Sequence, residues 1–323
     1  MKHIRFSYGA ILILGVAYAV FQVTSLPVAP FRLIDSTSYL NFLPIRSATY
    51  PLILRWIGPQ LTMLAQPVLY AAAATALSLC LMAIGRGAPL AFAVLICCFF
   101  NPEVNRCHAQ IMTESLYLTA MLVFLVAVVG FFRQPGWPLA MITALVAGLA
   151  ATVRPTGYAL LPVLILMVLM ARRSLRGSVT VVLAAAMLPM VVMVSAERCY
   201  TTWIHGSDAT TLAGRHLFAK SVLIKAPPMA RAESDPRRRR LLVAAEQHFA
   251  PIRDLLDQAP DANVLSVLST NYEMCLEYSC VADLRAAIGL PEAAMNRIAL
   301  AGLGAALWGE KGVCPLLGTA QRG

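Results

Sequence analysis

Long apolar runs separated by short polar segments dominate the first 195 residues of the chain. A helix that crosses a hydrocarbon core of about 30 Å needs around 20 apolar residues, and most of the runs approach or reach that length. A proline after an arginine divides the stretch 136–171, because proline breaks a helix and disfavours helical backbone in the residue before it. The pattern therefore predicts seven membrane spans, at about 8–26, 61–84, 87–100, 115–132, 136–153, 157–171 and 177–195.

Two longer segments depart from this pattern. Residues 27–60, between the first two spans, are partly apolar and amphipathic, which predicts short helices in the membrane interface. Residues 196–323 have the composition of a soluble segment, with helical patterns around 239–258 and 281–306. The sequence thus predicts an all-α polytopic membrane protein with a transmembrane domain at 1–195. A mainly helical, extracytoplasmic segment follows at 196–323.

Composition agrees with a membrane protein. Apolar residues make up 59% of the chain and charged residues 13%, against roughly 45–50% and 25% in soluble domains. The net charge of +10 is concentrated in residues 1–195, which carry twelve basic and three acidic groups. The chain has no motif typical of nucleic-acid binding, so no nucleic-acid partner is expected.

Basic residues near the span ends predict the orientation. With the N-terminus in the cytoplasm, the seventh span delivers residues 196–323 to the outer side, which would be the periplasm of a bacterium. The basic residues then on the cytoplasmic side are Lys2, Arg5, Arg86, Arg133, Arg172, Arg173 and Arg176.

Four cysteines of the outer segment, Cys199, Cys275, Cys280 and Cys314, have two open interpretations. They could pair as disulfides in an oxidising compartment, or remain buried thiols. The spacing of Cys275 and Cys280 is not that of a zinc site, and no histidine accompanies them in a zinc-binding pattern. No metal-ligating set is therefore expected from these residues.

Only three acidic residues occur in the first 195 positions, namely Asp35, Glu103 and Glu114, and the predicted topology places all three on the outer side. A carboxylate close to the membrane is costly unless it has a partner or a task. Asp35 has two interpretations: a helix cap or ion pair with Arg32, or a general base at the membrane surface. Glu114 opens the fourth span, where Thr113 or Ser115 could cap the helix and a negative charge is favourable.

Arginines on the same side are candidates for binding phosphate. Arg154 lies in the tight turn between two spans, and Arg46 and Arg55 lie in the first outer loop. Guanidinium groups bind phosphate in bidentate fashion, so the three form a candidate clamp. The competing interpretation is a structural ion pair of Arg154 with Glu103 or Glu114.

Four short motifs on the outer side occur together and in order. Together they resemble bacterial members of the GT-C superfamily of glycosyltransferases, near the protein mannosyltransferase and aminoarabinose transferase families. The resemblance covers roughly residues 1–225. The motifs are Asp35-Ser36-x-Ser38-Tyr39, Arg46-x3-Tyr50-Pro51, Thr113-Glu114-Ser115-Leu116-Tyr117 and Arg154-Pro155-Thr156-Gly157.

The resemblance implies a fold, a reaction and roles for these residues. Such enzymes have many spans and transfer a sugar from a polyprenyl-phosphate carrier on the outer face of the membrane, inverting the sugar carbon. Asp35 would deprotonate the acceptor hydroxyl, and Glu114 would position the acceptor, the sugar or a metal. Stabilisation of the leaving phosphate should be the larger effect in a site of low dielectric constant. The residues implied to bind substrate or phosphate are Arg154, Arg46, Arg55, Tyr39 and Tyr50.

The resemblance also implies partners and a location. The donor would be a polyprenyl-phosphate sugar, the acceptor a glycan, lipid or protein, and the location the bacterial inner membrane. Asp35 is followed by Ser36 where many relatives have a second acid, so a divalent metal would find few oxygen ligands here. Two other interpretations remain: a transporter or flippase for a lipid-linked or anionic substrate, and a truncated, inactive scaffold. Truncation is an alternative because members of the superfamily continue through further spans.

Overall fold

The computed structural model describes most of the chain up to residue 206. The described residues are 2–33, 35–44, 46–84, 87–175, 177–206, 234–237, 239–240, 242–244, 247, 250 and 254. The chain divides into two compact units, residues 1–204 and 205–323, and the first of them contains the predicted transmembrane domain. The helical pattern predicted around 281–306 lies outside the described residues, as do Cys275, Cys280 and Cys314.

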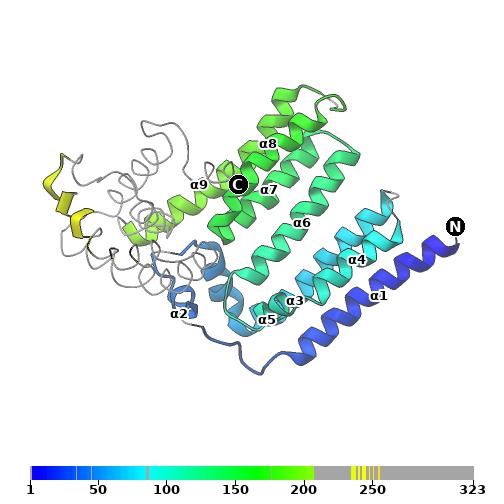
Figure 1. Ribbon diagram of the computed structural model, residues 1–323, viewed down its shortest axis with the longest axis horizontal. Helices are drawn as coiled ribbons and strands as arrows, with labels where there is room; N and C mark the ends of the chain where they lie inside the picture. The colour runs from blue at the N-terminus through cyan, green and yellow to red at the C-terminus, as the bar shows by residue number, and fades with distance from the viewer. Residues whose placement is uncertain are drawn as a thin grey trace. The chain divides into compact units, whose positions relative to one another are not determined.

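The first unit is built from helices, which Figure 1 shows in chain order. Within the described residues the extended structure is limited to a single bridge between Phe31 and Gln110. The elements are α1 (Lys2–Ser25), α2 (Ser36–Leu40), α3 (Thr49–Ala83), α4 (Ala88–Phe99), α5 (Pro102–His108), α6 (Glu114–Arg133), α7 (Trp137–Val153), the 3-10 helix η1 (Pro155–Ala159), α8 (Leu160–Ala171) and α9 (Val179–His205).

Among the described residues, four helices are long and apolar enough to cross a membrane: the α1 segment Ser7–Ser25, α3, α6 and α9. A fifth span is possible if α4 and α5 act together, although a bend of 56° separates them. The segments Trp137–Val153 and Pro155–Ala171 are apolar but shorter. The predicted helical class is therefore confirmed, and the length and apolarity of these helices are compatible with a membrane protein. The number of seven spans stays a prediction, although each predicted span coincides with a helix.

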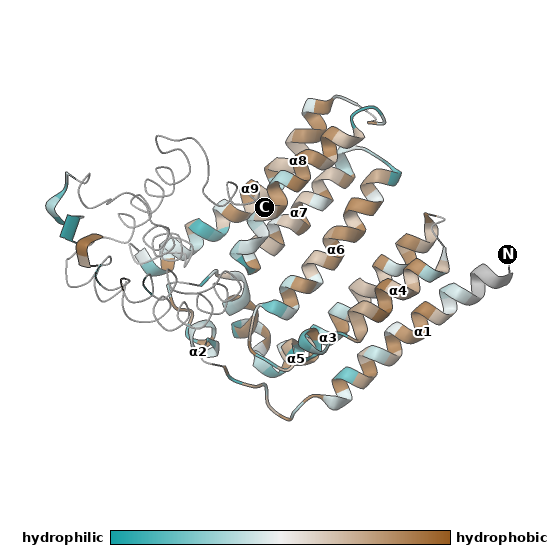
Figure 2. Ribbon diagram, in the orientation of Figure 1, coloured by the Kyte–Doolittle hydropathy of each residue, from teal (hydrophilic) through white to brown (hydrophobic). Residues whose placement is uncertain are grey.

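Helix α7 packs mainly through small residues, whereas many large apolar side chains of the helices are exposed. Ala140, Ala144 and Ala147 of α7 are fully buried, whereas Leu145 and Leu149 of the same helix are 43% and 38% exposed. Figure 2 shows that apolar residues predominate along the helices. A Cβ added at Gly148 would lie 3.1 Å from the Cα of Met190, so α7 and α9 are in close contact there. Close approach through small residues is typical of helices that pack in lipid, where burial of large apolar groups brings no gain over lipid contact.

Helix α3 consists of two parts. Gly58 has φ 81° and ψ 157°, a backbone conformation outside the helical region, and Pro59 follows it. The first part, together with α2, belongs to the predicted outer loop 27–60, so the short helices predicted there are present. The second part runs from Pro59 to Ala83 and matches the predicted span 61–84.

Helix α9 continues beyond the boundary predicted at residue 195. It ends at His205, and the division into two compact units falls between Ile204 and His205. In these added turns the Thr201 hydroxyl donates to the backbone oxygen and to Oε1 of Glu197, at 2.9 and 3.1 Å. A hydropathy pattern ends at the first charged residues, whereas the helix itself continues through polar residues.

Candidate functional site

Two segments that are far apart in sequence, and that the sequence predicts to be on the same side of the membrane, lie against each other. The backbone N–H of Phe31 donates to Ala109 O at 2.8 Å, and that of Ile111 donates to Phe31 O at 3.2 Å. The Ser36 hydroxyl accepts a bond from the Leu33 N–H at 2.8 Å and donates to Ile111 O at 3.2 Å. These bonds hold the start of α2 beside the segment that leads into α6.

Arg46 is the centre of the first polar cluster. Its Nη2 lies 2.6 Å from Oδ1 of Asp35. Its Nε donates to the Ser38 hydroxyl at 2.7 Å, and Nη1 donates to the Tyr39 hydroxyl at 3.1 Å. The Arg46 side chain is only 9% exposed, and that of Asp35 is 23% exposed. All three guanidinium nitrogens of Arg46 thus contact either Asp35 or residues of α2.

Tyr39 connects this cluster to the start of α6. Its hydroxyl lies 3.4 Å from the Thr113 hydroxyl, at hydrogen-bond distance. Burial raises the pKa of Tyr39 above its ordinary value, and the nearby positive charge of Arg46 only partly opposes this effect. The phenol is therefore protonated at neutral pH and can serve as both donor and acceptor. Tyr50 is fully buried and packs edge-on against Tyr39, with 5.3 Å between the ring centroids.

Glu114 and Arg154 form the second ion pair, through Oε1 and Nη1. Helices α6 and α7 are antiparallel neighbours, so the start of α6 and the end of α7 meet. The exposed fractions are 24% for Glu114 and 37% for Arg154, so solvent or a ligand can reach part of each side chain, whereas Oε2 of Glu114 is buried. Of the two interpretations of Arg154, the structure shows the pair with Glu114, which does not prevent the other nitrogens of Arg154 from binding an anion.

The turn that carries Arg154 depends on its sequence. Arg154 follows the end of α7 in extended backbone conformation, and Pro155 begins η1. The N–H of Gly157 donates to Arg154 O at 2.9 Å. A Cβ at position 157 would lie 2.5 Å from the backbone nitrogen of Ala151, so only glycine fits. Packing in this turn therefore requires the glycine of the Arg-Pro-Thr-Gly sequence, independently of the resemblance of that sequence to a family motif.

The capping interpretation of the Glu114 region is not what the structure shows. Thr113 precedes α6 but makes no side-chain cap bond, and its hydroxyl faces Tyr39 instead. The Ser115 hydroxyl lies 2.8 Å from Nδ1 of His108. Glu114 itself is in the first turn, where its charge is favourable.

The pairing of Asp35 differs from the sequence-based expectation, because it pairs with Arg46 and not with Arg32. Glu103 lies 3.7 Å from Arg106 in a highly exposed pair on α5, and the partner of Arg154 is Glu114. Arg55 is exposed on the first part of α3, and none of the ion pairs of the described residues includes it.

Glu197 is a fourth acid at this end of the helices, and the sequence pattern did not single it out. Its Oε1 accepts a bond from the backbone N–H of Ala48 at 2.9 Å, so α9 is tied to the segment between Arg46 and the start of α3. The residue follows the last predicted span by only two positions. A search for acidic residues that continued a few positions beyond the predicted span 177–195 would have found Glu197.

His108 belongs to a separate network of polar side chains. It is fully buried, with Nε2 at 3.1 Å from the Tyr18 hydroxyl and Nδ1 at the Ser115 hydroxyl. Tyr18 in turn donates to Asn105 Oδ1 at 2.6 Å. These bonds join α1, α5 and α6, and indicate a role in packing.

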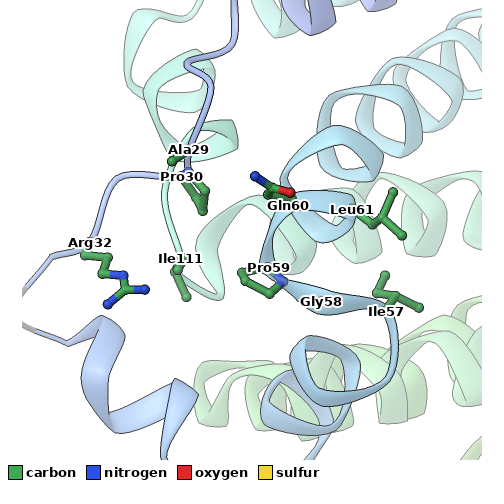
Figure 3. Close-up of a pocket in the computed structure, with 9 residues that line it drawn as sticks. All are labelled: Ala29, Pro30, Arg32, Ile57, Gly58, Pro59, Gln60, Leu61 and Ile111. Atoms are coloured by element: carbon green, nitrogen blue, oxygen red, sulfur yellow. The ribbon is translucent and has the colours of Figure 1, made fainter.

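Among the described residues there is no group of three or more His, Cys, Asp or Glu side chains that could hold a metal ion. A cavity of about 430 Å³ lies beside the polar clusters, between the segment after α1 and the kink of α3 (Figure 3). Its lining residues are Ala29, Pro30, Arg32, Ile57, Gly58, Pro59, Gln60, Leu61 and Ile111.

No protein-family model matches the chain, and no curated protein or solved structure is significantly similar to it.

Proposed function

We propose that the protein is a GT-C-type membrane glycosyltransferase that transfers a sugar from a polyprenyl-phosphate carrier to an acceptor on the outer face of the bacterial inner membrane. One observation carries the proposal. Asp35 and Glu114, which belong to different outer segments, each pair with an arginine, and Tyr39 and Thr113 connect the two pairs. The four motifs that carry the family resemblance thus contribute to one polar cluster at one end of apolar helices.

In this proposal Asp35 is the general base. It lies at the start of α2 and remains 23% exposed, so an acceptor hydroxyl can approach it. Arg46 fixes the position of the carboxylate and is itself held by Ser38 and Tyr39. A base of this kind typically contributes 10²–10⁴-fold to the rate. Because its nitrogens are all engaged, Arg46 acts as a positioning residue rather than a phosphate ligand.

Arg154 is the residue proposed to bind the donor phosphate. A guanidinium group has five N–H donors, and the contact with Glu114 uses only Nη1. The remaining donors can bind two phosphate oxygens and stabilise the charge that develops as the sugar leaves. Glu114 orients Arg154 through Oε1, and its buried Oε2 makes no hydrogen bond among the described residues. Arg55 is exposed on the first part of α3, so a contact with the donor from there would be peripheral.

The proposed enzyme also has a defined topology in the membrane and a defined stereochemical outcome. Seven spans in a GT-C arrangement, with a cytoplasmic N-terminus, place every motif on the outer side. Exposed large apolar side chains such as Phe21, Leu69 and Leu166 support contact with lipid, and Figure 2 shows that apolar residues run along the length of the helices. Displacement of the phosphate by the acceptor oxygen in one step inverts the sugar carbon. The hydroxyl proton passes to Asp35. The polyprenyl phosphate leaves with the electrons of the broken bond between the sugar carbon and the phosphate oxygen.

The test is a transfer assay with the purified full-length protein, radiolabelled polyprenyl-phosphate sugars and membrane acceptors. Asp35→Asn should lower the rate about 10²–10⁴-fold. Glu103→Gln is the matched control, since it makes the same kind of change in an exposed pair outside the cluster, and it should leave the rate unchanged. Equal transfer by wild type and Asp35→Asn would rule out the base, and no transfer by wild type would favour the inactive scaffold.

A further inference from the structure

We infer that the cavity between residues 29–32 and the Gly58 kink of α3 binds the headgroup phosphate of an anionic membrane phospholipid. This site is distinct from the proposed donor site. None of its lining residues belongs to the two ion pairs or to the Tyr39–Thr113 connection. The inference does not depend on glycosyl transfer.

The charge of the cavity is the first argument. Arg32 lines it, and none of the described residues that line it is an aspartate or glutamate. Arg46 and Arg154 each pair with a carboxylate, whereas none of the ion pairs of the described residues includes Arg32. Figure 3 shows the Arg32 guanidinium directed toward Ile111 at the cavity. An uncompensated guanidinium at a cavity is suited to a phosphate, which it binds in bidentate fashion.

The shape of the cavity is the second argument. The kink at Gly58 opens α3, and no atom outside the adjoining residues lies within 4 Å of the point where a Cβ at this position would stand. The Gly58 carbonyl accepts a bond from the Thr62 hydroxyl at 2.7 Å, which satisfies it despite the kink. The volume of about 430 Å³ is within the range of roughly 300–1,000 Å³ typical of ligand sites.

The surroundings favour a lipid over a soluble anion. Ile57 and Leu61 line the cavity and are 44% and 59% exposed, and nearby Val28 is 95% exposed. The apolar second part of α3 begins at the cavity. A phosphate at Arg32 would therefore leave its attached acyl chains beside the exposed apolar residues of α3. A free phosphate would gain nothing from these residues.

The lipid would also affect the neighbouring cluster. Ile111 lines the cavity and bonds through its backbone to Phe31, next to Arg32. The same segment continues to Ser36, which bonds to Ile111 O. A bound headgroup would thus stabilise the pairing that positions Asp35 at the start of α2.

Native mass spectrometry of the detergent-purified full-length protein tests the inference, with phosphatidylglycerol and phosphatidylcholine as probes. Wild type should bind phosphatidylglycerol at least tenfold more tightly than phosphatidylcholine. Arg32→Gln should lose most of this preference. Arg55→Gln is the matched control, because Arg55 is exposed on the same part of the chain but does not line the cavity, and it should behave as wild type.

A second variant keeps the charge and blocks the space. Ala29→Phe fills the cavity and should also weaken phosphatidylglycerol binding at least tenfold, with thermal unfolding in detergent as the check of folding. Equal binding by wild type and Arg32→Gln would overturn the inference, as would an equal loss in Arg55→Gln. Displacement by inorganic phosphate at similar affinity would indicate a soluble-anion site. Displacement by equimolar polyprenyl phosphate would assign the cavity to the donor. Either result also overturns the inference, whereas failure of the transfer assay does not affect it.

Discussion

The arginines at this end of the helices differ in what surrounds their guanidinium groups. Arg46 is 9% exposed and has all three nitrogens engaged, which suits a residue that holds a carboxylate in place. Arg154 is 37% exposed and uses one nitrogen toward Glu114, which leaves donors for a ligand. Arg32 lines a cavity to which the described part of the chain contributes no acidic side chain. The contacts and the exposure of the three guanidinium groups therefore indicate three different roles. The residue type alone does not distinguish these roles.

The pairing of Asp35 with Arg46 should be visible in stability measurements. Arg46→Gln leaves the Asp35 charge without its partner and should lower the free energy of unfolding by about 2–3 kcal/mol. This is somewhat less than a fully buried pair would lose, because Asp35 keeps contact with solvent. Asp35→Asn in the same chain should restore part of the loss, since the uncompensated charge is then removed. A double-mutant cycle by denaturant unfolding in detergent measures both effects.

A coupling energy near zero in that cycle would contradict the ion pair. Arg55→Gln is the control for removal of an arginine as such, and should change stability by less than about 0.5 kcal/mol because the residue is exposed.

At the scale of elements, the turn between α7 and η1 shows how one small residue positions a functional group. Arg154 is the last residue before η1, and η1 can pack against α7 only because Gly157 has no side chain. Ala150 and Ala151, which face Gly157 across the turn, are also buried. The close packing of η1 against α7 therefore determines where the Arg154 guanidinium can reach. It thereby allows the pairing of Arg154 with Glu114.

Gly157→Ala should destabilise the protein by about 1–3 kcal/mol, because the added methyl would clash with the backbone of α7 and force it to move. Binding of a polyprenyl-phosphate donor should weaken in the same variant as Arg154 shifts. Gly136→Ala is the matched control: it lies at the other end of α7 in extended backbone, and its Cβ would make an ordinary contact at 3.6 Å. Thermal unfolding in detergent should show a lower midpoint for Gly157→Ala alone.

At the scale of the whole molecule, the arrangement places the polar clusters at one end of the helices that are apolar enough to span a membrane. The starts of α3 and α6 and the ends of α7 and α9 meet there through the side chains of Glu197, Glu114 and Arg154. An enzyme that receives a lipid-linked substrate from the membrane needs its reactive groups at such an end. The proposed orientation makes this end extracytoplasmic.

Cysteine labelling in intact cells tests that orientation. In a background in which the eight native cysteines are replaced, Thr156→Cys in η1 should react with a membrane-impermeant maleimide. Gln134→Cys, exposed in the turn before α7, should react only after permeabilisation, because the whole of α7 separates it from η1. Labelling of both from outside would show that α7 does not cross the membrane. The reverse pattern would show the opposite orientation.

The sequence was enough to predict the helical class, the approximate bounds of the helices and the grouping of Asp35, Glu103 and Glu114 near one end of them. These features follow from the local periodicity and length of apolar runs, which are properties of neighbouring residues. The sequence also singled out Asp35, Glu114 and Arg154 as candidate site residues.

The tertiary structure shows which of these residues pair, and it adds Glu197 and the cavity at Arg32. Contacts such as that of Glu114 with Arg154 join residues 40 positions apart, so they depend on how the helices pack. Local pattern carries no information about that packing.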